Sequence, residues 1–313
     1  MFVIFEVANI CMMQAMKTMR KIFAIGLAIL AAVACRPSGG KDLQTETVNY
    51  EDSTAHADLS IKVELPVAGQ GAAADRIRAS LVEVMDGQLS HIGTYEEERL
   101  FPAFEGDGSK TESLVTYYRD KALEAFGRMS QEDYDERVAS IEENDGLTED
   151  QRKETLEEMP GWEYEFSLLK SRETRKYVVF LSQDYVYLAG AHGGITGRGG
   201  LTFDKKEGAL VDKMLDPACL DAIQPLLRKG IAQYFSEGGM EIAQEELDNY
   251  LLLETGVVPF PGWTPYPGED GLVFTYQQYE IAAYAAGMPE FTVPYADILP
   301  YLTPEAKALL DLE

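Results

Sequence analysis

Residues 162–204, WEYEFSLLKSRETRKYVVFLSQDYVYLAGAHGGITGRGGLTFD, decide the fold of this chain more than any other stretch. From Trp162 to Leu168, large apolar side chains alternate with other residues, which is the period of a strand with one buried face. The apolar run 177–181 predicts a second strand, and residues 185–188 predict a third. Together these segments predict an antiparallel ribbon.

Glycines dominate the next segment. Six of them between Gly190 and Gly200 predict a loop whose backbone angles side chains would forbid, followed by a strand at 201–203. His192 lies in this loop, and Gly193 and Gly194 would allow a ligand to approach the backbone closely. An imidazole can bind a metal, transfer protons or simply brace a loop by hydrogen bonding. The structural brace is the preferred interpretation, and a binding role is the alternative.

The remaining pattern mixes strands and helices without a regular βαβ repeat. We therefore predict an α+β fold, with an antiparallel sheet and helices packed on one of its faces, in two small α+β units at 53–183 and 184–313. Ser130 and Thr148 are expected to cap two short exposed helices in 130–158, and Asp216 and Thr303 are expected to cap two later helices. Further strands are predicted at 59–65, 272–276 and 291–293, and further helices at 72–85 and 115–129.

A proline-rich loop at 259–268 presents aromatic side chains. Four prolines stiffen it, and it contains Phe260, Trp263 and Tyr266. Rigid aromatic side chains bind partners at low entropic cost, so Trp263 and Tyr266 are candidate binding residues. The alternative is that they pack on the protein's own sheet.

The N-terminal segment has the order of a secretion signal. Lys17, Arg20 and Lys21 precede the apolar run 22–34, which ends in small residues directly before Cys35. About 13 residues at roughly 1.5 Å each span about 20 Å, which is shorter than the roughly 30 Å hydrocarbon core of a bilayer. The run therefore predicts a cleaved signal peptide rather than a permanent membrane span.

The segment Ala32-Val33-Ala34 before the cysteine resembles a lipobox. We expect residues 1–34 to be removed, with Met16 as the true start, and Cys35 to carry lipid. Residues 35–52 are polar and are predicted to be a flexible tether. The mature protein is then anchored in the cell envelope outside the cytoplasm.

Composition narrows the choice of partner. The chain has 27 basic and 53 acidic residues, a net charge of -26; without Lys17, Arg20, Lys21 and Glu6 it has 24 and 52, or -28. Nucleic acid is excluded, because its phosphates are bound by Lys and Arg clusters and none appears along the sequence after Cys35. A cationic partner is electrostatically favoured.

Three segments resemble a known family. They are YVYLAGAHGG (185–194), LTFDKKEGALVDKMLDP (201–217) and LVFTYQQYEIAAYAAGMPEFTVPYADILPYL (272–302). Residues 184–302 resemble the C-terminal domain of unknown function of RsiV-type anti-sigma factors, and 49–180 resemble the companion domain attached to PdaC-type deacetylases. Ala283 stands where the family usually has proline, so one turn is expected to differ.

The resemblance implies an α+β envelope module whose best-known relative recognises lysozyme. Signalling is not implied, because no cytoplasmic sigma-binding segment precedes Cys35. We expect a lipid-anchored binding module for a protein or cell-wall ligand, with a lysozyme-like cationic protein as a candidate. The alternative is an envelope hydrolase acting on peptidoglycan or its substituents. No catalytic motif, metal site or cofactor is predicted, and Cys219 is expected to be a small core residue.

Overall fold

The computed structural model describes residues 42–312 except 95–97, 192, 239–241 and 243–245. All of them belong to one compact unit, Gly39–Glu313. The predicted signal segment, Cys35 and His192 lie outside the described residues. Within the described part of the chain, no helix is both long and apolar enough to cross a membrane.

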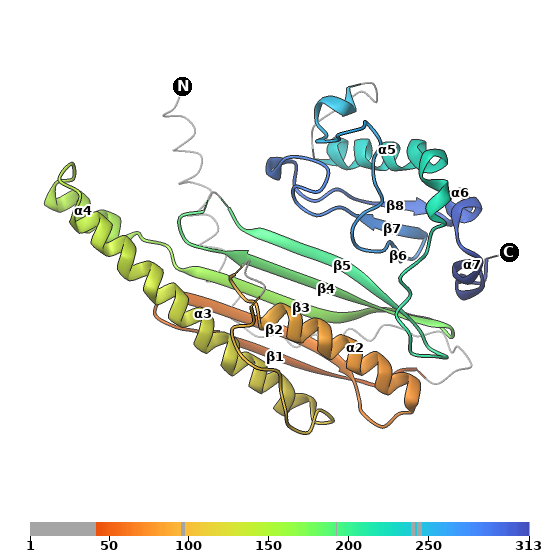
Figure 1. Ribbon diagram of the computed structural model, residues 1–313, viewed down its shortest axis with the longest axis horizontal. Helices are drawn as coiled ribbons and strands as arrows, with labels where there is room; N and C mark the ends of the chain where they lie inside the picture. The colour runs from red at the N-terminus through yellow and green to blue at the C-terminus, as the bar shows by residue number, and fades with distance from the viewer. Residues whose placement is uncertain (1–41, 95–97, 192, 239–241, 243–245, 313) are drawn as a thin grey trace. The chain divides into compact units, whose positions relative to one another are not determined.

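The larger sheet has five strands in sequential order (Figure 1). They are β1 (Thr45–Ser53), β2 (Ala57–Pro66), β3 (Trp162–Glu173), β4 (Tyr177–Tyr187) and β5 (Ile195–Asp204). Neighbouring strands are antiparallel, as predicted, except that β2 and β3 are parallel. A parallel pair requires a long crossover, and here residues 67–161 supply it with three helices.

Two of these helices cover one face of the sheet. α2 (Ala72–Leu89) packs on β2, and α3 (Thr111–Glu142) packs on β1 and β2. We call this side of the sheet the helix face, and the opposite side the outer face. The predicted stripe Ile77, Leu81 and Met85 on α2 is fully buried, which confirms it as a core face.

The third helix, α4 (Glu149–Glu157), begins where it was predicted to begin. Thr148 accepts a hydrogen bond from the backbone N–H of Gln151 at 3.3 Å, and this confirms its capping role. The prediction for Ser130 is wrong, because α3 continues through it to Glu142. Its buried hydroxyl instead donates to the backbone oxygen of Gly127 at 3.0 Å, so one long helix replaces the first short one.

The C-terminal part of the chain builds a second, three-stranded antiparallel sheet. α5 (Leu220–Glu237) packs on its last strand. Asp216 and Thr303 both cap helix starts as predicted, by accepting from Ala218 and Ala306. The remaining elements are η1 (Pro217–Cys219), η2 (Leu247–Asn249), β6 (Tyr266–Pro267), β7 (Gly271–Thr275), η3 (Tyr284–Ala286), β8 (Glu290–Pro294), α6 (Tyr295–Ile298), η4 (Leu299–Tyr301) and α7 (Pro304–Leu310).

Strand β4 is shared between two hydrophobic cores. Val178 and Phe180 pack into the core under α2 and α3, while Tyr177 and Val179 pack into the core of the C-terminal sheet. Since all four side chains are buried, the strand has no solvent-facing side here. The domain boundary expected between residues 183 and 184 falls inside this strand, so both parts of the chain contribute to the larger sheet.

The structure changes two details of the sequence interpretation. Residues 45–52 are not a tether, because β1 begins at Thr45 and pairs with β2 along its full length. Ala283 has φ -63°, the angle that proline imposes, so the chain keeps a proline-like backbone at this turn without the proline.

Candidate functional site

The glycine-rich stretch is mostly a strand, which corrects the predicted loop. β5 begins at Ile195 and includes Gly197, Gly199 and Gly200. Gly190 has a positive φ of 87°, whereas Gly194, Gly197, Gly199 and Gly200 do not. The glycines after Gly190 therefore provide space. A Cβ atom on any of the described ones, from Gly193 to Gly200, would lie closer than 3.0 Å to a neighbouring side chain.

Two aromatic side chains fill the space beside β5. A Cβ atom on Gly199 would overlap the ring of Trp263, and one on Gly200 would overlap Tyr266. Trp263 packs against the core of the helix face, whereas Tyr266 is buried in the C-terminal core. Successive residues of a strand point to opposite faces, so the proline-rich loop passes around the edge of β5 with one ring on each side.

The outer edge of β5 is held by two glutamine side chains. Gln277 accepts a hydrogen bond from the backbone N–H of Arg198 at 3.0 Å and donates to its carbonyl oxygen at 2.8 Å. The side chain of Gln278 accepts from the N–H of Thr196 at 2.8 Å. Unpaired edge groups invite pairing with another chain, and these two side chains satisfy three of them.

The turn after these glutamines displays a tyrosine. Tyr279 is 61% exposed and has φ 67°, a left-handed angle that non-glycine residues seldom adopt. Glu280 fixes the turn on both sides, because its carboxylate accepts from the N–H groups of Gly262 at 2.6 Å and Gln277 at 2.7 Å. Strained, exposed and rigidly held residues cluster at functional sites, so Tyr279 is a candidate.

A second tyrosine connects this turn to the glycine-rich segment. The ring of Tyr284 lies 5.8 Å from that of Tyr279, and its hydroxyl donates to the carbonyl oxygen of Gly194 at 2.6 Å. A Cβ atom on Gly193 would overlap this hydroxyl, and one on Gly194 would overlap the ring of Tyr185. The two predicted glycines are therefore the contact points between β4 and the Tyr284 segment.

Two cross-strand pairs extend the site along the outer face of the larger sheet. Tyr185 lies opposite Glu165, and Tyr187 lies opposite Glu163. Burial, followed by the charge of Glu163, raises the pKa of the Tyr185 hydroxyl, and Tyr284 and Glu165 also contribute. These side chains therefore lie close enough to act together. We call them the tyrosine–glutamate surface: Glu163, Glu165, Tyr185, Tyr187, Tyr279 and Tyr284.

An unusual carboxylate lies on the other side of the same strand. Asp184 faces Phe166 and Gly197 on the helix face, and burial raises its pKa to about 6. In the described part of the chain, no side chain donates a hydrogen bond to it. The buried hydroxyls of Tyr164 and Ser182, on the same face, likewise lack partners among the described residues. The environment of Asp184 therefore disfavours the ionised carboxylate.

Two further observations concern the chemical groups of the described residues. Among the described residues, no three His, Cys, Asp or Glu side chains converge on a possible metal position. Cys219 is half-buried, and burial raises the pKa of its thiol, which disfavours the nucleophilic thiolate. The side chains that lie closest to Gly193 and Gly194 in the described residues are those of Tyr284 and Tyr185.

Sequence reasoning identified part of this site. It singled out Gly193 and Gly194, which lie in it, and Trp263 and Tyr266, which instead cover β5. It missed the tyrosines, although the dense run TYQQYE at 275–280 was a visible signal. Their grouping depends on strand register and on the return of the chain to β5, neither of which is local in sequence.

Comparisons with known proteins agree with this architecture. Residues 212–296 match a family described as a protein of unknown function, DUF3298. A solved structure of a DUF3298 family member from Bacteroides fragilis is similar, with 18% identity, a TM-score of 0.60, and coverage of 85% of this chain and 96% of that one. A DUF3298 family protein from Pseudomonas aeruginosa has 14% identity, a TM-score of 0.50, and coverage of 85% and 97%. No curated protein matches the chain.

Proposed function

We propose that this chain is a lipid-anchored binding module of the cell envelope, and that its tyrosine–glutamate surface holds a cationic protein. The observation that carries the proposal is the rigid display of Tyr279 beside the paired rows of tyrosine and glutamate on β3 and β4. Tyrosines supply large contact areas at low entropic cost, and carboxylates steer a cationic partner to them. The net charge of -26 adds a long-range attraction.

The finer family resemblance supports the choice of ligand. Residues 184–302 resemble the extracytoplasmic end of RsiV-type proteins, whose best-known member recognises lysozyme. Residues 49–180 resemble the PdaC-associated domain, which is also an envelope module. Lysozyme is strongly cationic, so it matches both the resemblance and the charge of the surface.

The direct test is a calorimetric titration of the full-length protein, in a mild non-ionic detergent, with lysozyme at low and high salt. We expect binding that weakens as salt screens the charges. Tyr279→Ala is expected to weaken binding at least tenfold, or about 1.4 kcal/mol, because it removes the most exposed aromatic anchor of the tyrosine–glutamate surface. Glu165→Gln should weaken binding only a few-fold and reduce its salt dependence.

The matched control is Glu132→Gln, which removes the same charge from an exposed position on α3. It should leave the affinity for lysozyme within about twofold, as expected for a charge far from the contact. If Glu165→Gln and Glu132→Gln weakened lysozyme binding equally, the binding would depend on the overall charge of the protein and not on a contact at Glu165. Absence of binding at low salt would refute the choice of a cationic protein.

The anchor is tested separately. Cells that express the protein should incorporate labelled fatty acid into it, and Cys35→Ser should abolish this incorporation while leaving the export signal intact. Mass spectrometry of the mature N-terminus would identify the acylated residue. A mature chain that retains residues before Cys35 would contradict the proposed processing.

A further inference from the structure

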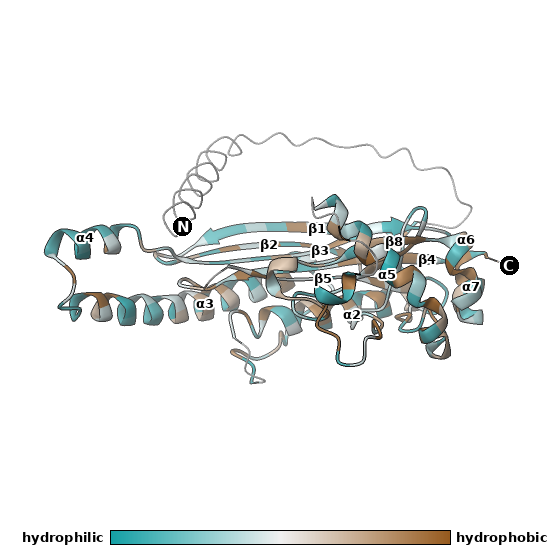
Figure 2. Ribbon diagram, turned by 90° about the horizontal axis from the view of Figure 1, so that it is seen from above, coloured by the Kyte–Doolittle hydropathy of each residue, from teal (hydrophilic) through white to brown (hydrophobic). Residues whose placement is uncertain are grey.

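The helical hairpin of α3 and α4 carries an incomplete apolar core. After Ser130, the rest of α3 has no buried residue, and α4 has none at all. Figure 1 shows the two helices lying beside one another, and Figure 2 shows how hydrophilic both are in this part. A nine-residue helix is marginal in water unless it packs an apolar face, so α4 lacks much of the stabilisation that most helices receive.

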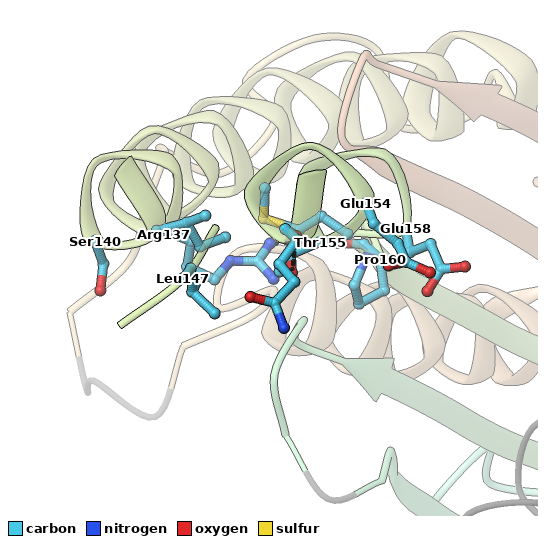
Figure 3. A pocket seen from close by; sticks show the side chains of 10 residues that line it. Arg137, Ser140, Leu147, Glu154, Thr155, Glu158 and Pro160 are labelled. Carbon is cyan, nitrogen blue, oxygen red and sulfur yellow. Dashed lines mark hydrogen bonds between the residues drawn. The ribbon is translucent and has the colours of Figure 1, made fainter. Parts of the chain in front are cut away.

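A groove of about 600 Å³ lies between the two helices (Figure 3). Its apolar walls come from Ile141, Leu147, Met159 and Pro160, none of which is fully buried. The groove is open to solvent. Helix-binding grooves in other proteins have this character, with apolar pockets that accept side chains at helical spacing.

The charge around the groove favours a basic partner. Residues 130–158 contain twelve acidic and three basic side chains, a net charge of -9. Glu154 and Glu158 line the groove, and neither carboxylate has a side-chain partner within the described part of the chain. The basic residue of the lining, Arg137, is already bound to Asp133 at 3.0 Å and to the carbonyl oxygen of Pro160 at 3.3 Å.

We propose that this groove docks a basic amphipathic helix from a partner protein. Its apolar face would complete the core between α3 and α4, and its Lys and Arg residues would pair with the free carboxylates on the rim. A second copy of this chain is disfavoured, because each copy carries a net charge of -26. The site is distinct from the tyrosine–glutamate surface and does not depend on the function proposed for that surface.

The base of the hairpin is firmly attached, so a docked helix would be held in place. The indole N–H of Trp162 donates to Asp133 at 2.9 Å, and His56 stacks on Tyr134 at 3.6 Å between ring centroids. Both contacts join α3 to the sheet side of the protein. The groove begins one turn further along the helix, at Arg137.

The test uses a fluorescein-labelled synthetic helix of leucine and lysine, fourteen residues long, titrated with the full-length protein and followed by anisotropy. The probe should bind, and Glu154→Lys combined with Glu158→Lys should weaken binding at least tenfold. Ile141→Ser combined with Leu147→Ser should do the same by removing the apolar walls. Circular dichroism would confirm that each variant keeps its fold, and a variant that unfolds would be replaced by its single substitutions.

The matched control changes the same number of charges on the same hairpin. Glu132→Lys combined with Glu136→Lys lies on exposed positions of α3 outside the groove, and should weaken binding less than threefold. A scrambled peptide of identical composition should bind at most one tenth as well. Equal losses in both lysine pairs, equal binding of the scrambled peptide, or no binding of the probe would overturn the proposal.

A further variant separates the two surfaces. Tyr279→Ala should leave the affinity for the peptide unchanged, even though it is expected to weaken binding of lysozyme. If Tyr279→Ala instead abolished peptide binding, the peptide would occupy the tyrosine–glutamate surface, and the groove would be refuted as a second site. Concentration-dependent sedimentation of the protein alone would reveal self-association, which would also contradict the proposed occupant.

Discussion

Gly199→Ala is expected to lower the free energy of unfolding by about 3 kcal/mol, because its new methyl group would overlap the ring of Trp263. The ring packs against the core of the helix face, so moving it away from Gly199 would cost these apolar contacts. Urea unfolding followed by tryptophan fluorescence would measure the change, with Trp263 itself as one of the two reporters.

The control for this variant is Gly108→Ala. Gly108 has no atom near the position of an added Cβ, and its φ is not positive. We expect a change within about 0.5 kcal/mol there, as for most surface substitutions. If Gly199→Ala were as stable as the unmodified protein, the packing of the proline-rich loop around β5 would be wrong.

Asp184→Asn is expected to stabilise the protein at neutral pH and to have almost no effect in acid. Burial raises the pKa of Asp184 to about 6 from its ordinary value of 3.8, so the folded state binds this proton more tightly than the unfolded state. The stabilisation that comes from this tighter proton binding is complete below pH about 4 and is lost as the pH rises to about 6. Removing the charge should therefore recover about 2 to 3 kcal/mol at pH 7.5.

Thermal unfolding at pH 4 and pH 7.5 would show this difference. Asp58→Asn provides the comparison, because Asp58 is an exposed carboxylate on β2, and it should leave the melting temperature nearly unchanged at both pH values. A loss of stability at pH 7.5 in Asp184→Asn would instead mean that the ionised carboxylate has a partner that stabilises it.

Local sequence patterns predicted most of the elements but not their assembly. Alternation at 162–168 and the stripe of Ile77, Leu81 and Met85 correspond to β3 and α2, because each period reports the one face that a single element buries. The prediction of a loop at the glycines of β5 was wrong. Gly199 and Gly200 leave room for the rings of Trp263 and Tyr266, and no local sequence pattern records such long-range contacts.

The candidate site shows the same division. Gly193 and Gly194 were recognisable as special from their sequence alone, whereas the importance of Tyr185 follows from its register opposite Glu165. Tyr279 required knowledge of its backbone angle and exposure. Glu154 and Glu158 could be assigned only to a solvated acidic stretch until α3 and α4 were seen to enclose a groove.

The proposed function depends above all on contact between a cationic protein and the tyrosine–glutamate surface. Amide hydrogen exchange, measured on the full-length protein with and without saturating lysozyme, tests it most directly. We expect slower exchange in 185–188 and 279–285, with little change in the sheet strands under α2 and α3. Protection confined to other segments, or none at a lysozyme concentration that saturates binding, would contradict it.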